Sequence, residues 1–85
     1  MYNLTIINYT YHDDYKKEAT NTTFIKLENA LMIASAVEKA EDFCELYIVE
    51  TVRGEIVYSR KANQDPYYDA ASLKQIVKFF DSLSN

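Results

Sequence analysis

The chain has 85 residues, 48% of them hydrophobic, and a formal net charge of −4, which suits one ordered domain over residues 1–85 and leaves no room for a second. One glycine, one proline and no low-complexity run exclude a linker. No apolar run approaches the roughly 18 residues of a membrane span, and the start lacks signal-peptide features, so we expect a cytoplasmic chain without a membrane segment. The single cysteine, Cys44, excludes an internal disulfide and is most simply a buried thiol.

The first 26 residues predict two strands. Side chains alternate from Tyr2 to Tyr11, but the apolar phase changes near Ile6, which indicates either a bulge there or burial on both faces. Residues 12–19 are polar and predict a loop. The stretch from Thr20 to Lys26 is rich in β-branched and aromatic residues and predicts the second strand of a long hairpin.

The loop carries the one cluster that resembles a metal site, His12, Asp13 and Asp14. Adjacent residues rarely converge on one ion, and the chain has no second histidine. We therefore interpret the cluster as a solvated turn and predict no metal and no cofactor.

An amphipathic helix is predicted from Leu27 to Phe43, a stretch without glycine or proline. Ala30 and Ile33 widen its apolar stripe, whereas Met32 lies off it, either as ordinary surface or as a soft contact for a partner. The stripe consists of Leu27, Leu31, Ala34, Val37 and Ala40.

The segment from Cys44 to Lys61 predicts a second hairpin, which turns at the only glycine, Gly54. With a loop of residues 52–54, Glu45 faces Lys61 and Val49 faces Val57. One face of this hairpin would hold Cys44, Leu46, Ile48, Ile56 and Tyr58. The other would hold Tyr47, Val49 and Val57, which is too apolar for a solvated surface and needs a second layer or a partner to cover it.

A C-terminal helix is predicted to start at Asp65 and Pro66, an N-cap carboxylate followed by a residue whose φ is already set. Its apolar stripe is Leu73, Ile76, Val77, Phe80 and Leu83. Tyr68 and Phe79 lie off this stripe and are candidate interface residues. The order strand, strand, helix, strand, strand, helix predicts an α+β fold, a four-stranded antiparallel sheet with two helices, the first covering one face and the second an end or edge.

Acidic residues gather between residues 38 and 55, where six acids stand against two bases and account for the whole net charge. Four of them could form one ridge from helix to strand: Glu38, Glu41, Asp42 and Glu45. Such a ridge is either a solvated surface or a patch that docks a basic partner. No basic stripe occurs, so direct nucleic-acid binding is not expected.

No catalytic motif is present, and a Cys44–His12 pair would lack the glycine-built turn that stabilises an oxyanion. We therefore do not expect an enzyme. The residue types that favour protein interfaces, tyrosine above all, are abundant, with eight tyrosines in the chain.

Residues 24–60 resemble short proteins encoded by Gram-positive phages and mobile elements, in which a helix with the pattern Ala-Leu-x-x-Ala precedes a strand, a Gly-Glu turn and a strand ending near Tyr, Ser and Arg. The residues that carry the resemblance are Ala30, Leu31, Ala34, Gly54, Glu55, Val57, Tyr58, Ser59 and Arg60. Val52 and Arg53 depart from it, since a more turn-prone pair is usual there. The resemblance implies a source and a fold more than an activity.

These observations favour a non-enzymatic protein-binding module with a basic partner, in the manner of anti-CRISPR or anti-restriction inhibitors of host nucleic-acid-handling complexes. The alternative is a homodimer that associates through the apolar strand face and the helix aromatics. The partner-binding residues predicted are Glu38, Glu41, Asp42, Glu45, Tyr47, Val49, Val57, Tyr68 and Phe79.

Overall fold

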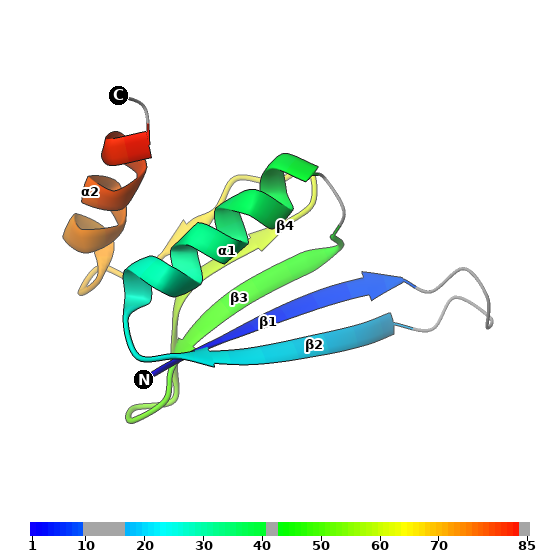
Figure 1. Cartoon of the computed structure of the whole chain (residues 1–85), viewed down its shortest axis with the longest axis horizontal. Coiled ribbons are helices and arrows are strands. Elements are labelled where there is room, and N and C mark those ends of the chain that lie inside the picture. The colour runs from blue at the N-terminus through cyan, green and yellow to red at the C-terminus, as the bar shows by residue number, and fades with distance from the viewer. Residues whose placement is uncertain (10–16, 41–42, 84–85) are drawn as a thin grey trace.

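Five strands and two helices make up the computed structural model, which describes residues 1–9, 17–40 and 43–83 (Figure 1). The elements are β1 (Tyr2–Tyr9), β2 (Lys17–Phe24), α1 (Leu27–Ala40), β3 (Glu45–Glu50), β4 (Glu55–Lys61), β5 (Tyr67–Tyr68) and α2 (Leu73–Leu83). The predicted α+β class with two helices and an antiparallel sheet is confirmed. The predicted strand number is wrong, because the two residues of β5 add a fifth strand.

The strands form one antiparallel sheet in the order β2-β1-β3-β4-β5. The hairpins β1–β2 and β3–β4 are therefore joined by pairing between β1 and β3. Leu4 lies between Thr22 and Ile48 in this arrangement, and β1 keeps one uninterrupted register with each neighbour. Of the two explanations for the change of apolar phase near Ile6, the bulge is therefore wrong.

The predicted end of the polar loop at residue 19 is wrong, because Lys17 to Ala19 belong to β2. The β-ladder with β1 extends that far, and backbone pairing there overrides the polar side chains. The cluster at His12, Asp13 and Asp14 lies outside the described residues, as do Glu41 and Asp42.

Helix α1 packs across one face of the sheet and buries Leu27, Leu31 and Ala34 against it. Met32 is exposed, and so is Ile33, at 44%, although the predicted stripe included it. The core is one cluster of side chains from the helices and β1, β3 and β4: Leu4, Leu27, Ala30, Leu31, Ala34, Leu46, Ile48, Val57, Tyr58 and Ile76.

The β3–β4 hairpin has the predicted register at its open end, where Glu45 pairs with Lys61 and Ile48 with Tyr58. Between Ile48 and Val49 the register shifts by one residue, so that Val49 pairs with Ile56. Such a bulge places two consecutive side chains of one strand on the same side. Val57 consequently turns into the core beside Tyr58, and Ile56 turns outward at 44% exposure, the reverse of the predicted faces.

Helix α2 starts at Leu73, eight residues after the predicted cap at Asp65. Two contacts hold the preceding segment extended: Tyr68 pairs with Tyr58, and the Asp69 N–H donates to the Val57 carbonyl (2.9 Å). The carboxylate near the helix start is Asp69, whose Oδ1 accepts from the Ala71 N–H (3.2 Å). Tertiary strand pairing has therefore overridden the Asp-Pro start signal.

Both helices lie on the same face of the sheet. The Phe80 ring of α2 lies 6.1 Å from the Tyr58 ring, and α2 stands beyond the β4–β5 edge, beside one end of α1 (Figure 1). Within the described part of the chain no element covers the opposite face of the sheet.

Candidate interaction surface

A groove between α1 and the β1–β2 hairpin is one of several hollows on the described surface, and it differs from the others in having no charged lining residue and mostly apolar walls. It encloses about 360 Å³. Its described lining residues are all uncharged, and most are apolar: Ile6, Asn8, Thr20, Ile33, Ala36, Val37 and Ala40. We refer to this feature as the groove.

The side chains of three elements explain why α1 leaves a hollow there. The second half of α1 turns small residues, Ala36 and Ala40, toward the sheet edge. On the same side of the sheet β2 contributes the short, exposed Thr20, and β1 contributes Asn8, so neither fills the space. Close packing would require larger side chains at these positions.

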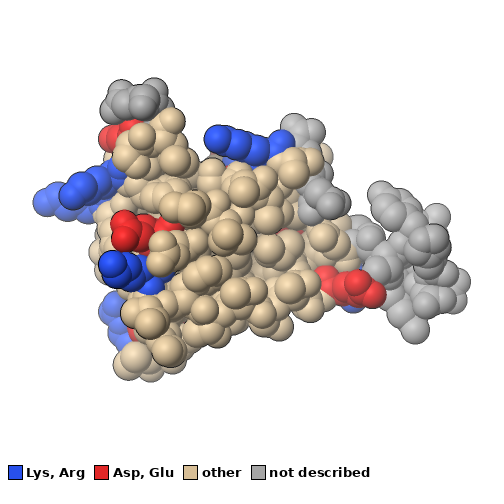
Figure 2. Space-filling model, in the orientation of Figure 1, with Lys and Arg blue, Asp and Glu red and all other residues tan. Residues whose placement is uncertain are grey.

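The surface around the groove carries little charge. Figure 2 shows the molecule in the orientation of Figure 1, with a largely uncharged area across the middle of this face. Lys, Arg, Asp and Glu side chains lie around the margin of this area. An uncharged centre with a charged rim is the usual composition of a protein interface.

The opposite, uncovered sheet face forms a second surface. Cross-strand pairing aligns one row across all five strands: Asn21, Thr5, Tyr47, Ser59 and Tyr67. Thr5 Oγ1 donates to Asn21 Oδ1 (2.6 Å), and the Asn3 side-chain amide donates to Thr5 Oγ1 (3.2 Å). Hydrogen bonds between side chains thus link β1 to β2 on this face, although no described element covers it.

Two predicted interface residues, Tyr47 and Val49, lie on that uncovered face and are half-buried by their neighbours. Val57, predicted to lie beside them, is 1% exposed in the core and cannot touch a partner. The bulge in β4 is the reason for this difference.

Glu38, the first acid of the predicted ridge, is engaged within the fold. The Tyr58 hydroxyl donates to Glu38 Oε1, and Arg60 Nη1 lies 3.3 Å from Glu38 Oε2. The Glu38 side chain is only 9% exposed. Burial, and secondly the hydrogen bond to Glu38, raises the pKa of Tyr58 well above its ordinary value, so this phenol stays protonated and remains a donor.

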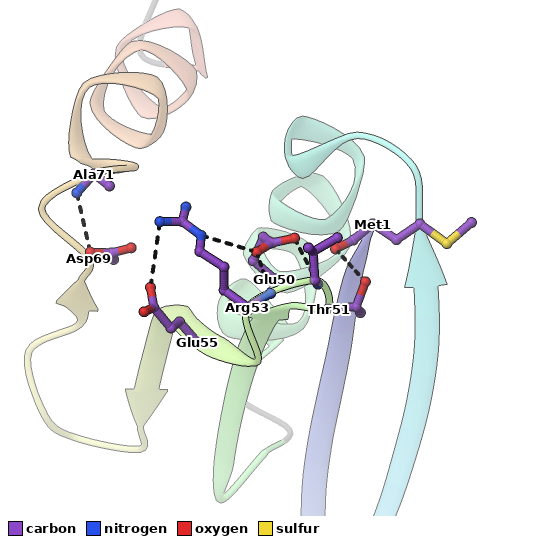
Figure 3. Close-up of polar contacts among 8 residues, drawn as sticks. Met1, Glu50, Thr51, Arg53, Glu55, Asp69 and Ala71 are labelled. Carbon is purple, nitrogen blue, oxygen red and sulfur yellow. Dashed lines mark hydrogen bonds and ion pairs between the residues drawn. The ribbon is translucent and has the colours of Figure 1, made fainter.

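Glu50 is likewise used locally, at the β3–β4 turn. Its carboxylate accepts from the backbone N–H groups of Val52 (2.9 Å) and Arg53 (3.0 Å). These backbone hydrogen bonds, that of Val52 first, lower the pKa of Glu50. The Arg53 guanidinium extends from Glu50 toward Glu55, as Figure 3 shows, at 3.5 and 3.9 Å respectively.

The other predicted interface residues are dispersed. Glu45 lies on the uncovered face opposite Lys61. Tyr68 is half-buried, with its ring 5.7 Å from that of Tyr58, and burial raises its pKa. Phe79 is half-buried on α2 and lines a small hollow against α1. The described members of the set therefore do not form one continuous patch.

Sequence reasoning missed the groove altogether. The available signal was the pair of small residues Ala36 and Ala40, four positions apart near the end of α1. Locating the hollow also requires the position of α1 over the sheet, which helical spacing does not give.

The described residues contain no group of three His, Cys, Asp or Glu side chains placed to hold a metal ion. Cys44 has a free, half-buried thiol. Its backbone N–H donates to the Ile7 carbonyl (2.8 Å). Neither of the helices in the described ranges is long and apolar enough to cross a membrane.

Comparison of the chain with models of known protein families, with curated proteins and with solved structures found no significant match.

Proposed function

We propose that this chain is a non-enzymatic protein-binding module that holds an apolar segment of a protein partner in the groove. The observation that carries the proposal is a hollow of about 360 Å³ whose described lining residues are uncharged and mostly apolar. A hollow of this size is at the lower end of the range for ligand sites, about 300–1,000 Å³. It suits a few anchoring side chains of a partner better than a large cofactor.

Exposed apolar side chains beside the groove support the same proposal. Ile33 is 44% exposed on its wall, although a β-branched apolar residue in a helix is usually buried. Buried apolar anchors surrounded by weaker contacts provide most of the affinity of protein interfaces. Ile33 and Val37 would meet such anchors from the partner.

The narrower hypothesis, a mobile-element inhibitor that docks a basic host complex through its acids, is proposed only as a second candidate. Its support is the net charge of −4 and the resemblance over residues 24–60. Two described acids give it little help, because Glu38 is paired with Arg60 and Glu50 is bonded to a backbone turn. The groove is therefore the surface we would test first.

The test places a photo-crosslinking amino acid at Ala40, in the groove, and separately at Asn29, an exposed α1 position outside it. We expect a partner protein to crosslink from position 40 and not from position 29. The Kd of the complex between this partner and the unmodified chain is then measured. The same Kd is measured for two variants that introduce a charge at neighbouring positions of α1.

Ile33→Glu places a carboxylate in the groove wall and should weaken binding by at least about tenfold. Met32→Glu is the matched control, since Met32 is exposed on the same helix but lines a different hollow. Equal crosslinking from both positions, or an Ile33→Glu variant that binds as tightly as the Met32→Glu variant, would contradict the proposal.

A further inference from the structure

Strand β2 is an edge strand with few of the features that protect such edges, because its charged side chains, Lys17 and Glu18, stand at one end only. It has eight residues, and among those described no element pairs with its outer side. Proteins usually blunt an exposed edge with proline, a bulge, a short strand, charged side chains or a covering element. The other edge of this sheet follows that rule, since β5 has two residues, Pro66 precedes it, and β4 carries the bulge. Strand β2 has neither proline nor bulge.

The ladder identifies which backbone groups of β2 point outward. The Thr51 N–H donates to the Met1 carbonyl and the Ala62 N–H to the Cys44 carbonyl, each at 2.9 Å. Both bonds fit the strand registers, so odd-numbered residues of β1 bond toward β3 and even-numbered ones toward β2. In β2 the even-numbered residues consequently bond to β1. The outward N–H and C=O groups in the middle of the strand belong to Ala19, Asn21 and Thr23.

The side chains of β2 are complementary to a second, antiparallel copy of the same strand. In the register that places Asn21 opposite itself, Ala19 exchanges hydrogen bonds with Thr23, and Thr20 faces Thr22, a favourable cross-strand pair. Glu18 then lies diagonally from Lys26 of the second copy, within reach of these long side chains. A parallel arrangement would instead bring like charges together.

The same register would cover an exposed apolar side chain. Ile25 directly follows β2 and is 78% exposed. In the antiparallel pair it lies opposite Lys17 of the second copy, whose aliphatic stem would shield it from water.

We propose that β2 is a self-association edge, through which two copies of this chain pair antiparallel about a twofold axis and continue the sheet from one copy into the next. The twofold axis stands perpendicular to the sheet, because antiparallel pairing keeps each face on its own side. Both α1 helices then lie on one face of the joined sheet. This pairing uses backbone groups and does not depend on the groove.

Sedimentation over a concentration range up to millimolar tests the proposal, and we expect a reversible dimer. Glu18→Lys alone, and Lys26→Glu alone, should each raise the dimer Kd roughly tenfold, because each puts two like-charged contacts into the dimer. The double variant Glu18→Lys with Lys26→Glu should restore the original Kd. A wild-type chain that stays monomeric overturns the proposal, and the edge then either binds a strand of another protein or faces solvent. Single variants that dimerise with an unchanged Kd overturn it as well.

A backbone variant separates this edge from any other dimer contact. Ala19→Pro removes an outward N–H and leaves the ladder with β1 intact, so a monomer with an unchanged circular dichroism spectrum is expected. Ala19→Thr keeps the N–H and should still dimerise. In hydrogen exchange, raising the concentration should protect the amides of Ala19, Asn21 and Thr23 and leave those of Thr20 and Thr22 unchanged. Protection without this alternation, or dimerisation of the proline variant, overturns the proposal.

Discussion

Tyr58 joins four elements of the fold. It lies in β4, its ring packs against Tyr68 of β5 and Phe80 of α2, and its hydroxyl donates to Glu38 of α1. The ring is 1% exposed, so the hydroxyl can reach no water in place of Glu38. The sequence predicted that Tyr58 faces the core, but its carboxylate partner lies 20 residues away and follows from no spacing rule.

Tyr58→Phe should destabilise the fold by about 1–3 kcal/mol, because it leaves the mostly buried Glu38 carboxylate without its hydroxyl donor. Urea unfolding measures the change. Tyr67→Phe is the control, since Tyr67 is 54% exposed, and it should change stability by less than about 0.5 kcal/mol. Equal effects of the two substitutions would contradict the assigned role of Tyr58.

Glu50 should make the stability of the chain depend on pH in the acid range. Its folded pKa is lowered below 4.5 by two backbone N–H donors, so the folded state favours the charged carboxylate. This contribution is fully present above the unfolded pKa, near 4.5, and is lost as the pH falls through the lowered folded pKa.

Thermal melts of the Glu50→Gln variant between neutral and acid pH should therefore show a smaller loss of stability on acidification than the wild type. Glu55→Gln is the control, because Glu55 is exposed and makes one long contact with Arg53 (3.9 Å). A Glu50→Gln variant that loses stability as steeply as the wild type would refute the effect.

Among the elements, the β3–β4 hairpin shows best what local pattern can and cannot determine. The alternation of apolar residues and the Glu45–Lys61 pair predicted the register of its open half correctly. This was possible because the two strands of a hairpin are close together in the sequence. The bulge followed from no local signal. It adds one residue to β4, and both Val57 and Tyr58 are then buried in the core against side chains from other elements. The groove escaped prediction for the same reason, since α1 positions it from across the sheet.

Because of the bulge, substitutions at two adjacent positions should cost very different amounts of folding stability. Val57→Ala should cost about 2 kcal/mol, because Val57 is fully buried and its truncation leaves a cavity. Ile56→Ala removes more carbon atoms but should cost less than about 1 kcal/mol, because Ile56 is 44% exposed. Denaturant unfolding of both variants decides the matter. A larger cost at Ile56 would restore the face order that the sequence indicated.

At the scale of the whole molecule, the sheet and α1 share most of the core, whereas α2 joins it through few side chains. Ile76 is the only α2 residue in the described ranges that is fully buried, with Phe79 and Phe80 partly so. Segments with few buried contacts open with lower free energy than the core. The amphipathic pattern of α2 predicted its existence but not how little of its stripe reaches the core.

Native-state hydrogen exchange should therefore show α2 opening before β1 and β3. Ile76→Ala should speed exchange of the α2 amides and leave those of β3 unchanged, because it weakens only the docking of α2. Val77→Ala, on the exposed side at 46%, is the control. If the α2 and β3 amides accelerate together in Ile76→Ala, the chain unfolds as one unit and the prediction fails.

The strand order also determines how the chain can reach its fold. Each hairpin, β1–β2 and β3–β4, closes through contacts that are near in sequence, whereas Tyr2 pairs with Glu50 across 48 residues. Closing that distance costs chain entropy before the pairing returns any stability. The pairing between β1 and β3, which joins the two hairpins, should therefore form after each hairpin has closed. It should also set the folding rate. Substitutions at Thr5 and Tyr47, which face each other in this pairing, should slow folding more than changes in either turn.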